Sequence, residues 1–433
     1  MLFIEKVMKE IWKPYADVYK DKLKEYSKYD EETLKDIIKK GIDNYKYPAN
    51  TNQIVRMTSM ISCGCPHWRG NHALGGCSFC DFFTQTFEVF ILAEALKRKN
   101  VASYAEMVRY SFQVQRGEKV NPLPIEFITV FDTMNENEFG NIVFNELFSD
   151  PPLYNQEIRT LVCETRINSI TEEAVLLWKS KARDDLVIES GIEVGNEWLR
   201  NHWLNKKITD VEMYQAWDII HKAGCSVNSD ILFGIPGITE RQSIELFKYT
   251  YKKLTDSNSF VVSPLLCKGN DLQSNIIKHF SEDKEMIRIG VIKKELSGMP
   301  HILSLLTAFH ELFTEDETLI KKLGLAQRHF SEYYSKIIYR FRKSEYYPLV
   351  DSIIQVLTNM CLTQNIDDLR DLYDKIIRTD FYHRYLEQLS LEYGMEQLNE
   401  TLHIVAKKLS NVYSNEEGFK EFEKELSDFN FQY

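Results

Sequence analysis

Short β-branched segments recur at a regular interval from residue 125 onward. They occupy residues 125–131, 158–163, 186–193, 226–233 and 259–265, helical stretches separate them, and an apolar strand-like run over 54–61 precedes them as a sixth strand. One such stretch places Met213, Trp217 and Ile220 on one face, at the spacing of a buried helical stripe. Strands that start about 30–40 residues apart are typical of repeated βα units. The pattern predicts an α/β fold in which six parallel strands form a partial (β/α)6 TIM-like barrel, with its chemistry at the C-terminal strand ends.

Both flanks of this region are predicted to be helical. Residues 1–50 are rich in Lys and Glu spaced three or four apart, and apolar positions recur at helical spacing from residue 284 onward. We therefore expect an N-terminal helical extension over 1–50 and a core barrel over 51–275. An all-helical region over 276–433 is expected to pack on the barrel and cap its substrate.

The composition, 44% hydrophobic and 27% charged, is that of an ordinary soluble globular protein. No apolar run approaches the roughly 18 residues that a membrane span needs. Charge interrupts the N-terminal MLFIEKVMKEIWK too early for a signal peptide. We expect a cytoplasmic protein without a membrane partner, whose 8 cysteines serve as thiolates rather than disulfides.

The charge balance argues against nucleic acid as the substrate. The chain has 53 basic and 64 acidic residues, a net charge of −11, whereas nucleic-acid binders usually carry a basic excess. Between Arg328 and Tyr347 tyrosines do alternate with basic residues, as base stacking and phosphate binding would require. Helical spacing favours packing against the barrel for these tyrosines, so nucleic acid is the less favoured partner.

One loop after the first strand is dense in candidate metal ligands. It places Cys63, Cys65, Cys77 and Cys80 within 18 residues rich in glycine. One interpretation is an iron–sulfur cluster on three of these thiolates.

A zinc site is the alternative interpretation of the same loop. Cys77 and Cys80 could bind Zn²⁺ tetrahedrally with the two earlier cysteines, or with His67 and His72. The loop alone leaves both metal sites open.

The spacing Cys65-x11-Cys77-x2-Cys80, opened by Cys-Pro and closed by Gly-Gly-Cys-x-Phe-Cys, resembles radical S-adenosylmethionine (SAM) proteins of the elongator catalytic-subunit superfamily. The resemblance implies that Cys65, Cys77 and Cys80 hold a [4Fe–4S] cluster whose fourth iron binds SAM. It also implies that Phe79 lies beside the adenine and that Cys63 is the spare cysteine.

Two strand ends extend the resemblance. After the second strand, Thr133, Asn135 and Glu136 stand where relatives contact the methionyl amine of SAM, although a simple polar turn would give the same residues. After the third strand, Glu164 and Arg166 resemble the Glu-Ser/Thr-Arg element of the family. Residues two apart in a strand share a face, so both side chains are expected to point into the barrel, as SAM contacts or as a buried ion pair.

The next two strand ends agree as well. Glu193 and Arg200 lie in a segment similar to one in the radical SAM subunit of archaeosine synthase, without a gap through Thr209. The resemblance implies that Glu193 reaches the SAM ribose or amine and that Arg200 pairs with its carboxylate; an exposed helix arginine is the alternative. Gly234 and Pro236 resemble the Gly-Leu-Pro-Gly turn, whose glycine lets the backbone approach the adenine.

Together these segments, roughly residues 54–265, imply an oxygen-sensitive enzyme that cleaves SAM reductively to a 5′-deoxyadenosyl radical. That radical would abstract hydrogen from a small-molecule or peptide substrate, and an electron donor such as flavodoxin or ferredoxin would serve the cluster. Modification of a tRNA base is the alternative function, and a non-catalytic zinc protein is the remote one. Neither the substrate nor the fate of its radical can be predicted from these residues.

Overall fold

A computed structural model of the chain describes residues 1–44, 55–69, 75–80, 82–116, 125–129, 131–149, 160–293, 300–325, 346–429 and 431. Most of the run between Arg328 and Tyr347 and the candidate zinc ligand His72 therefore lie outside the described residues. None of the described helices is long and apolar enough to cross a membrane.

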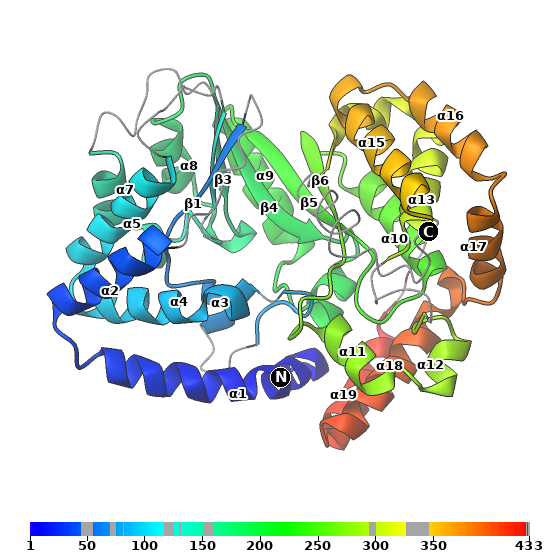
Figure 1. Cartoon of the computed structure of the whole chain (residues 1–433), viewed down its shortest axis with the longest axis horizontal. Helices are drawn as coiled ribbons and strands as arrows, with labels where there is room; N and C mark the ends of the chain where they lie inside the picture. The colour runs from blue at the N-terminus through cyan, green and yellow to red at the C-terminus, as the bar shows by residue number, and fades with distance from the viewer. Residues whose placement is uncertain are drawn as a thin grey trace.

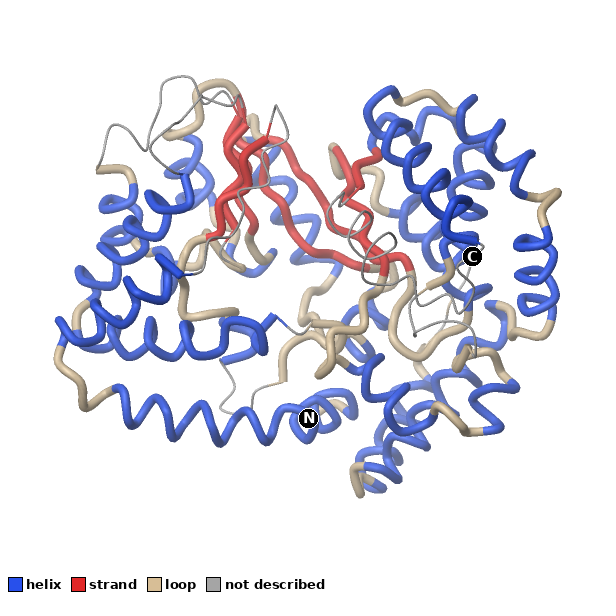
Figure 2. Tube along the Cα trace, viewed as in Figure 1, coloured by secondary structure: helices blue, strands red, loops and turns tan. Residues whose placement is uncertain are grey.

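The centre of the fold is a curled, seven-stranded parallel sheet whose strands follow one another in chain order (Figure 2). The strands are β1 (Val55–Ser59), β2 (Ile125–Thr129), β3 (Thr160–Glu164), β4 (Asp185–Glu193), β5 (Ser226–Phe233), β6 (Ser259–Pro264) and β7 (Leu323–Leu325). The first six coincide with the predicted strands within a few residues. The prediction of a partial TIM-like barrel is confirmed.

The seventh strand lies in the region that was expected to be wholly helical. It pairs with β6 through Leu323–Phe260 and Leu325–Val262. Gly324 permits the approach, because a Cβ at that position would lie 2.7 Å from the carbonyl oxygen of Phe260. Three residues are too few to produce a periodic signal, which explains why the sequence did not reveal this strand.

Helices precede, connect and follow the strands (Figure 1). Before the third strand they are α1 (Phe3–Tyr26), α2 (Glu31–Asn44), α3 (Pro66–Arg69), α4 (Phe82–Lys99), α5 (Val101–Arg116), α6 (Glu136–Phe139) and α7 (Asn141–Leu147). Between the third and seventh strands they are η1 (Ile167–Ser169), α8 (Glu172–Lys179), η2 (Leu199–Trp203), α9 (Asp210–Lys222), α10 (Glu240–Lys253), α11 (Leu272–Phe280), α12 (Lys284–Arg288), α13 (Ile302–Glu315) and η3 (Glu317–Lys322). The last are α15 (Tyr347–Thr363), α16 (Asp367–Ile376), α17 (Asp380–Ser390), η6 (Met395–Gln397), α18 (Leu398–Val412) and α19 (Glu416–Ser427).

The two faces of the sheet differ in burial. Along β3, β4 and β5 fully buried residues alternate with half-exposed ones. The buried set is mainly apolar, as in Leu186 and Ile188, and α8, α9 and α10 contact these strands. The half-exposed set contains Glu164, Glu189 and Asp230. Along β3, β4 and β5 the inner face of the partial barrel is therefore polar and partly exposed.

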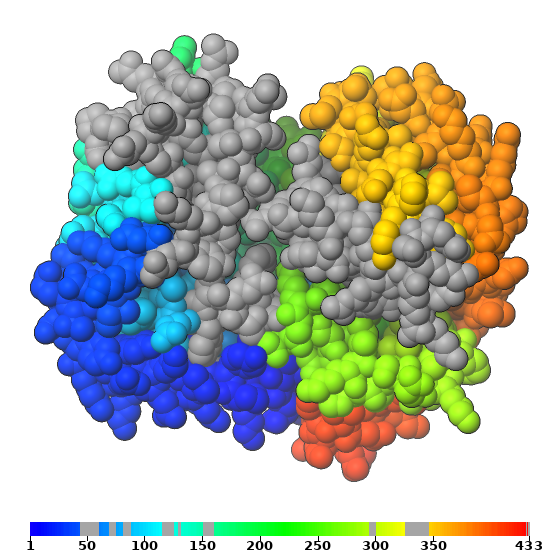
Figure 3. Space-filling view, in the orientation of Figure 1, coloured from blue at the N-terminus to red at the C-terminus, as the bar shows by residue number. Residues whose placement is uncertain are grey.

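The first helix, α1, and the last helix, α19, meet beside the cysteine loop. Helix α1 contacts α4, α11 and α19, and the N- and C-terminal surfaces adjoin along one edge of the molecule (Figure 3). The ring centroids of Phe3 and Phe422 lie 5.0 Å apart. Trp12 of α1 packs edge-on against Trp68, which belongs to the cysteine loop, with centroids 5.4 Å apart. The N-terminal helix thus braces the loop that carries the candidate ligands.

Candidate functional site

The three predicted ligands lie in a loop that joins β1 to α4. Cys65 is half-buried immediately before α3, and its carbonyl accepts a hydrogen bond from the Trp68 amide at 3.1 Å. Cys77 is buried and Cys80 is half-buried; the Cys80 amide donates to the Cys77 carbonyl at 3.1 Å. Cys77 and Cys80 therefore belong to one tight turn.

Arg166 lies beside two of these thiols. Burial raises the pKa of Cys65, and the Arg166 guanidinium opposes that rise. Burial by itself would lower the pKa of Arg166, but the neighbouring Cys65, Cys77 and Asp132 outweigh it and raise that pKa. A permanent cation next to the thiols favours the thiolate form, which is the form that binds iron. The structure thus places Arg166 beside the cysteine loop, and its predicted role as a SAM contact stays a prediction.

The described part of the loop contains the three predicted cluster ligands, whereas His72 of the zinc alternative lies outside it. Among the described residues, no three Cys, His, Asp or Glu side chains are grouped as a mononuclear site requires. In a [4Fe–4S] cluster each thiolate binds its own iron, so the sulfur atoms surround the cluster and need not meet at one ion. Cys63 is completely buried, and its amide donates to Glu138 Oε2 at 3.4 Å. Cys77 is buried as well, so the assignment of Cys63 as the spare cysteine stays a prediction.

His67, the candidate zinc histidine within the described part of the loop, forms a hydrogen bond with a backbone carbonyl. Its Nε2 lies 2.6 Å from the carbonyl oxygen of Asn205, which can only accept. Burial, with help from the nearby Arg166, lowers the pKa of His67 to about 3. The imidazole is therefore neutral and donates through Nε2.

Asp132 organises the end of β2. Its carboxylate accepts hydrogen bonds from Thr165 Oγ1 at 2.7 Å, the Arg166 amide at 3.0 Å and Ser169 Oγ at 2.8 Å. Asn135 Nδ2 adds a fourth at 3.0 Å. Sequence reasoning did not assign Asp132 a role, although it stands at the strand end next to the predicted residues. It fixes the backbone that carries Arg166.

The three residues predicted to contact the methionyl amine have other environments. Thr133 is buried, and its hydroxyl donates to the Glu164 carbonyl at 2.5 Å. Asn135 caps α6 by accepting from the Asn137 amide at 3.0 Å. Glu136 is exposed on the first turn of α6. These contacts are those of a polar turn, and the predicted contact with the methionyl amine stays a prediction.

Glu193 and Phe79 are brought together by a lysine. Lys206 Nζ donates to Glu193 Oε1 at 3.0 Å and lies 5.5 Å from the centre of the Phe79 ring. The side chains of Glu193 and Lys206 are each only 8% exposed. Gly191 leaves room for the pair, since a Cβ there would lie 2.4 Å from Glu193 Oε1. Sequence reasoning assigned Lys206 no role.

Arg200 does not join this group. It lies in η2, a turn of π-helix, with no solvent exposure. Its Nη2 donates to Asp210 Oδ1 at 2.5 Å and its Nη1 to Met213 Sδ at 3.6 Å. Both partners belong to α9. The expected pairing with the SAM carboxylate therefore finds no counterpart in this geometry, and neither does the alternative of an exposed arginine.

The turn after β5 has the predicted backbone. Gly234 has φ +81°, and a Cβ there would lie 2.6 Å from Pro300 Cγ. The Pro236 carbonyl accepts from Trp203 Nε1 at 2.7 Å. Thr239 caps α10 by accepting from the Gln242 amide at 3.2 Å. The turn thus ties β5 to η2.

Three carboxylates share the inner face of the sheet at neighbouring strands. Glu164 pairs in register with Glu189, and Glu189 Oε2 accepts from Asn228 Nδ2 at 2.7 Å. Burial, then repulsion from Glu164, raises the pKa of Glu189 to about 8. Burial and the negative charges of these glutamates and Glu193 also raise the pKa of Asp230 well above its ordinary value. Sequence reasoning identified only Glu164, although each of the three acids stands at an alternating, inward-facing position of its own strand.

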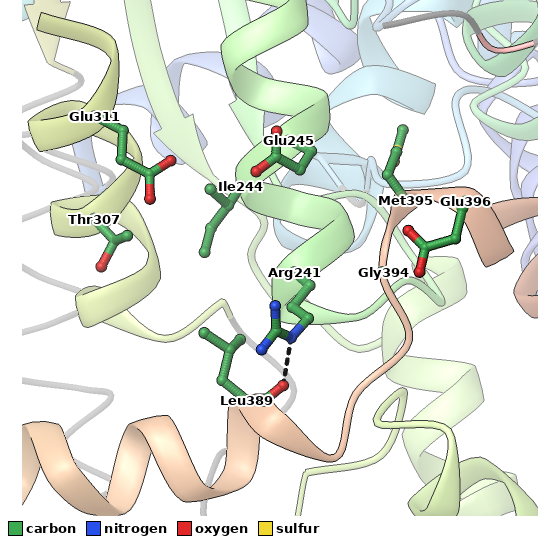
Figure 4. A pocket seen from close by; sticks show the side chains of 9 residues that line it. All are labelled: Arg241, Ile244, Glu245, Thr307, Glu311, Leu389, Gly394, Met395 and Glu396. Carbon is green, nitrogen blue, oxygen red and sulfur yellow. Dashed lines mark hydrogen bonds between the residues drawn. The ribbon is translucent and has the colours of Figure 1, made fainter. Parts of the chain in front are cut away.

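A separate hollow of about 350 Å³ lies between α10, α13 and the segment around Leu389 to Glu396 (Figure 4). Arg241 Nε donates to the Leu389 carbonyl at 2.5 Å on one side of it. Lys248 bridges Glu245 at 3.0 Å and Glu311 at 2.6 Å. None of the predicted site residues lines this hollow.

Comparisons with known proteins give weak likenesses only. No family model matches the sequence, and no curated protein is significantly similar to it. Coproporphyrinogen III oxidase from Escherichia coli, a radical SAM enzyme, is similar over 64% of this chain and 55% of its own, with 12% identity and a TM-score of 0.37. The radical SAM methyltransferase TsrM from Kitasatospora setae, with cobalamin and a [4Fe–4S] cluster bound, gives 52% and 40%, with 13% identity and a TM-score of 0.32.

Methylornithine synthase is similar over 70% of this chain and 74% of its own, with 12% identity and a TM-score of 0.34. The chain matches about half the length of the coproporphyrinogen oxidase and two fifths of the methyltransferase. Likenesses this loose transfer no reaction and no residue role to this chain, so its function has to be inferred from its own residues.

Proposed function

We propose that this chain is a radical SAM enzyme. Cys65, Cys77 and Cys80 would hold a [4Fe–4S] cluster, which supplies the electron that cleaves SAM to a 5′-deoxyadenosyl radical. The observation that carries the proposal is the position of Arg166. It follows the C-terminal end of β3 and lies beside two thiols of a loop that follows the C-terminal end of β1. In parallel sheets such ends meet at one edge, where barrel enzymes place their chemistry.

The residues near the loop suit a bound SAM molecule. The ring of Phe79 offers an apolar surface for the adenine, and Glu193 offers a carboxylate for the ribose or amine. Lys206 holds both in place, because it pairs with the carboxylate and lies over the ring. Gly234 supplies the left-handed backbone of the turn after β5. Arg166 offsets the negative charge of the thiolates.

The substrate is proposed to be a small molecule or a peptide rather than a tRNA base. The inner face of the barrel displays the carboxyl groups of Glu164, Glu189 and Asp230, which offer the phosphates of a nucleic acid no cationic partner. The net charge of −11 acts in the same direction. A one-electron donor such as flavodoxin or ferredoxin would serve the cluster.

Anaerobic reconstitution tests the proposal. The protein should bind about four irons per chain and, with dithionite and SAM, should release 5′-deoxyadenosine. Cys65→Ala, Cys77→Ala and Cys80→Ala should each abolish both properties. Cys63→Ala is the matched control, from the same loop, and should retain them. A protein that binds one zinc instead, or that loses the cluster equally in all four variants, would refute the assignment.

The tRNA alternative has its own test. Filter retention of total tRNA at low and high salt should be weak and nearly independent of salt for a small-molecule enzyme. Strong retention that falls steeply with salt would favour the nucleic-acid function instead.

A further inference from the structure

Residues 203–206, the last residue of η2 and the three that follow it, turn their backbone carbonyls toward the cysteine loop and Arg166. Ser78, which lies between Cys77 and Cys80, donates through its hydroxyl to the Trp203 carbonyl at 2.9 Å and through its amide to the Leu204 carbonyl at 3.0 Å. The first two carbonyls of the segment thus hold the turn that carries two predicted ligands.

Asn205 continues this series with both its backbone and its side chain. Its carbonyl accepts from His67 Nε2 at 2.6 Å. Its side-chain Nδ2 donates to the carbonyls of Gly75 at 2.9 Å and Gly76 at 2.8 Å. His67 comes two residues after Cys65, and Gly76 directly precedes Cys77. One buried asparagine therefore contacts both halves of the loop.

The backbone of the segment is built for this arrangement. The Leu204 amide donates to the Leu199 carbonyl at 2.8 Å, which closes the π-helical turn. Asn205 then adopts φ +55°, a left-handed conformation that asparagine tolerates better than most residues. The Lys206 carbonyl, next in line, accepts from Arg166 Nη2 at 2.6 Å. Four successive carbonyls thereby face the loop and its cation.

Resting on the function proposed above, we infer that Asn205 is the positioning residue that fixes Cys65 and Cys77 relative to each other for cluster binding. It acts through His67 on one ligand and through Gly76 on the other, and it touches neither thiol. Asn205 is 3% exposed, so water cannot replace the amide contacts without opening the site. The ligand geometry would then exist before any iron arrives.

Two variants separate this role from general stability. Asn205→Gly keeps the left-handed backbone, because glycine adopts positive φ freely, but removes both side-chain hydrogen bonds. Asn201→Ala is the matched control. Asn201 makes two hydrogen bonds within the same segment, to the Ile208 carbonyl at 2.9 Å and amide at 2.8 Å, and neither reaches the cysteine loop.

The first measurement is hydrogen exchange of the metal-free protein. The amides of the peptide that spans Ser78 to Cys80 should exchange at least tenfold faster in Asn205→Gly than in the parent, and within about twofold of the parent in Asn201→Ala. The second is the reconstituted protein under anaerobic conditions. Asn205→Gly should retain less than half of the parent's iron. The electron paramagnetic resonance signal of its reduced cluster should differ from the parent's and lose its response to SAM.

The outcomes distinguish the inference from the proposed function. Parent-like exchange and a parent-like signal in Asn205→Gly would overturn the inference, as would equal losses in Asn201→Ala. If the parent itself binds no four-iron cluster, the proposed function fails. The exchange arm then still decides whether Asn205 holds the loop.

Discussion

At the scale of single residues, the pair formed by Glu193 and Lys206 is the most sensitive contact near the cysteine loop. Removing one partner of a buried ion pair leaves an uncompensated charge and typically costs about 3–5 kcal/mol. Lys206→Met should therefore lower the free energy of unfolding by about 3 kcal/mol, measured by urea denaturation. Lys207→Met is the control, because Lys207 is 35% exposed in its pair with Glu5, and such pairs contribute about 1 kcal/mol or less. Equal effects of the two substitutions would contradict this account.

The carboxylate Glu189 makes stability depend on pH. Its pKa is about 8 in the folded protein against an ordinary value of 4.5, so the folded state binds its proton more tightly than the unfolded state. The free energy of unfolding should fall as pH rises from about 4.5 to about 8. In Glu189→Gln this contribution disappears, which should reduce the difference between pH 5 and pH 8.5 by an amount on the order of a few kcal/mol. Glu172→Gln, on the exposed surface of α8, should leave the profile unchanged.

The sequence predicted individual residues well where a local signal exists. The spacing of Cys65, Cys77 and Cys80 is such a signal, and Thr239 lies at a recognisable helix start. Asp132 and Asn205 were missed because their partners come from segments more than 30 and more than 125 residues away, respectively. Arg200 was assigned to SAM because its family resemblance says nothing of Asp210, the acid that neutralises it here.

At the scale of elements, α1 has a larger role than an N-terminal extension would have. Its Trp12 is 1% exposed and lies against Trp68. Truncation of a buried tryptophan costs about 3–5 kcal/mol and leaves a cavity. Trp12→Ala should therefore destabilise the protein and also lower its iron content after reconstitution. Ile38→Ala, a buried apolar substitution in α2, is the control that should destabilise without a matching loss of iron.

The strands were predictable and the packing of the helices was not. Burial alternates along β3, β4 and β5 because helices cover one face of the sheet and the other face is partly exposed. The sequence shows the same alternation of apolar and polar residues. The amphipathic pattern of α1 reveals a buried stripe, but not which element covers it. The strand around Gly324 could not be predicted either, because three residues are too few to show an alternating pattern.

At the scale of the whole molecule, Phe422 joins distant parts of the chain. It is completely buried and its ring lies 5.0 Å from Phe3, 6.0 Å from Trp198 and 5.8 Å from Trp203. Phe422→Ala should lower the free energy of unfolding by about 3–5 kcal/mol. Because the Trp203 carbonyl accepts a hydrogen bond from Ser78, hydrogen exchange of the backbone amides in the cysteine loop should also become faster. Phe419→Ala, which removes a half-buried ring on the same helix, should have less than half the effect on both measurements.

The long-range contacts of the cysteine loop set an order of events during synthesis. The loop leaves the ribosome well before the residues that hold it, because Ser78 and Trp203 are 125 positions apart and His67 and Asn205 are 138 apart. At about 5–20 residues per second, translation takes on the order of 10 s to cover that distance. A nascent chain therefore carries reactive thiols without their support for that interval. Iron delivered during it would meet unanchored cysteines, so productive assembly of the metal centre is confined to chains whose first four strands and residues 203–206 have been made.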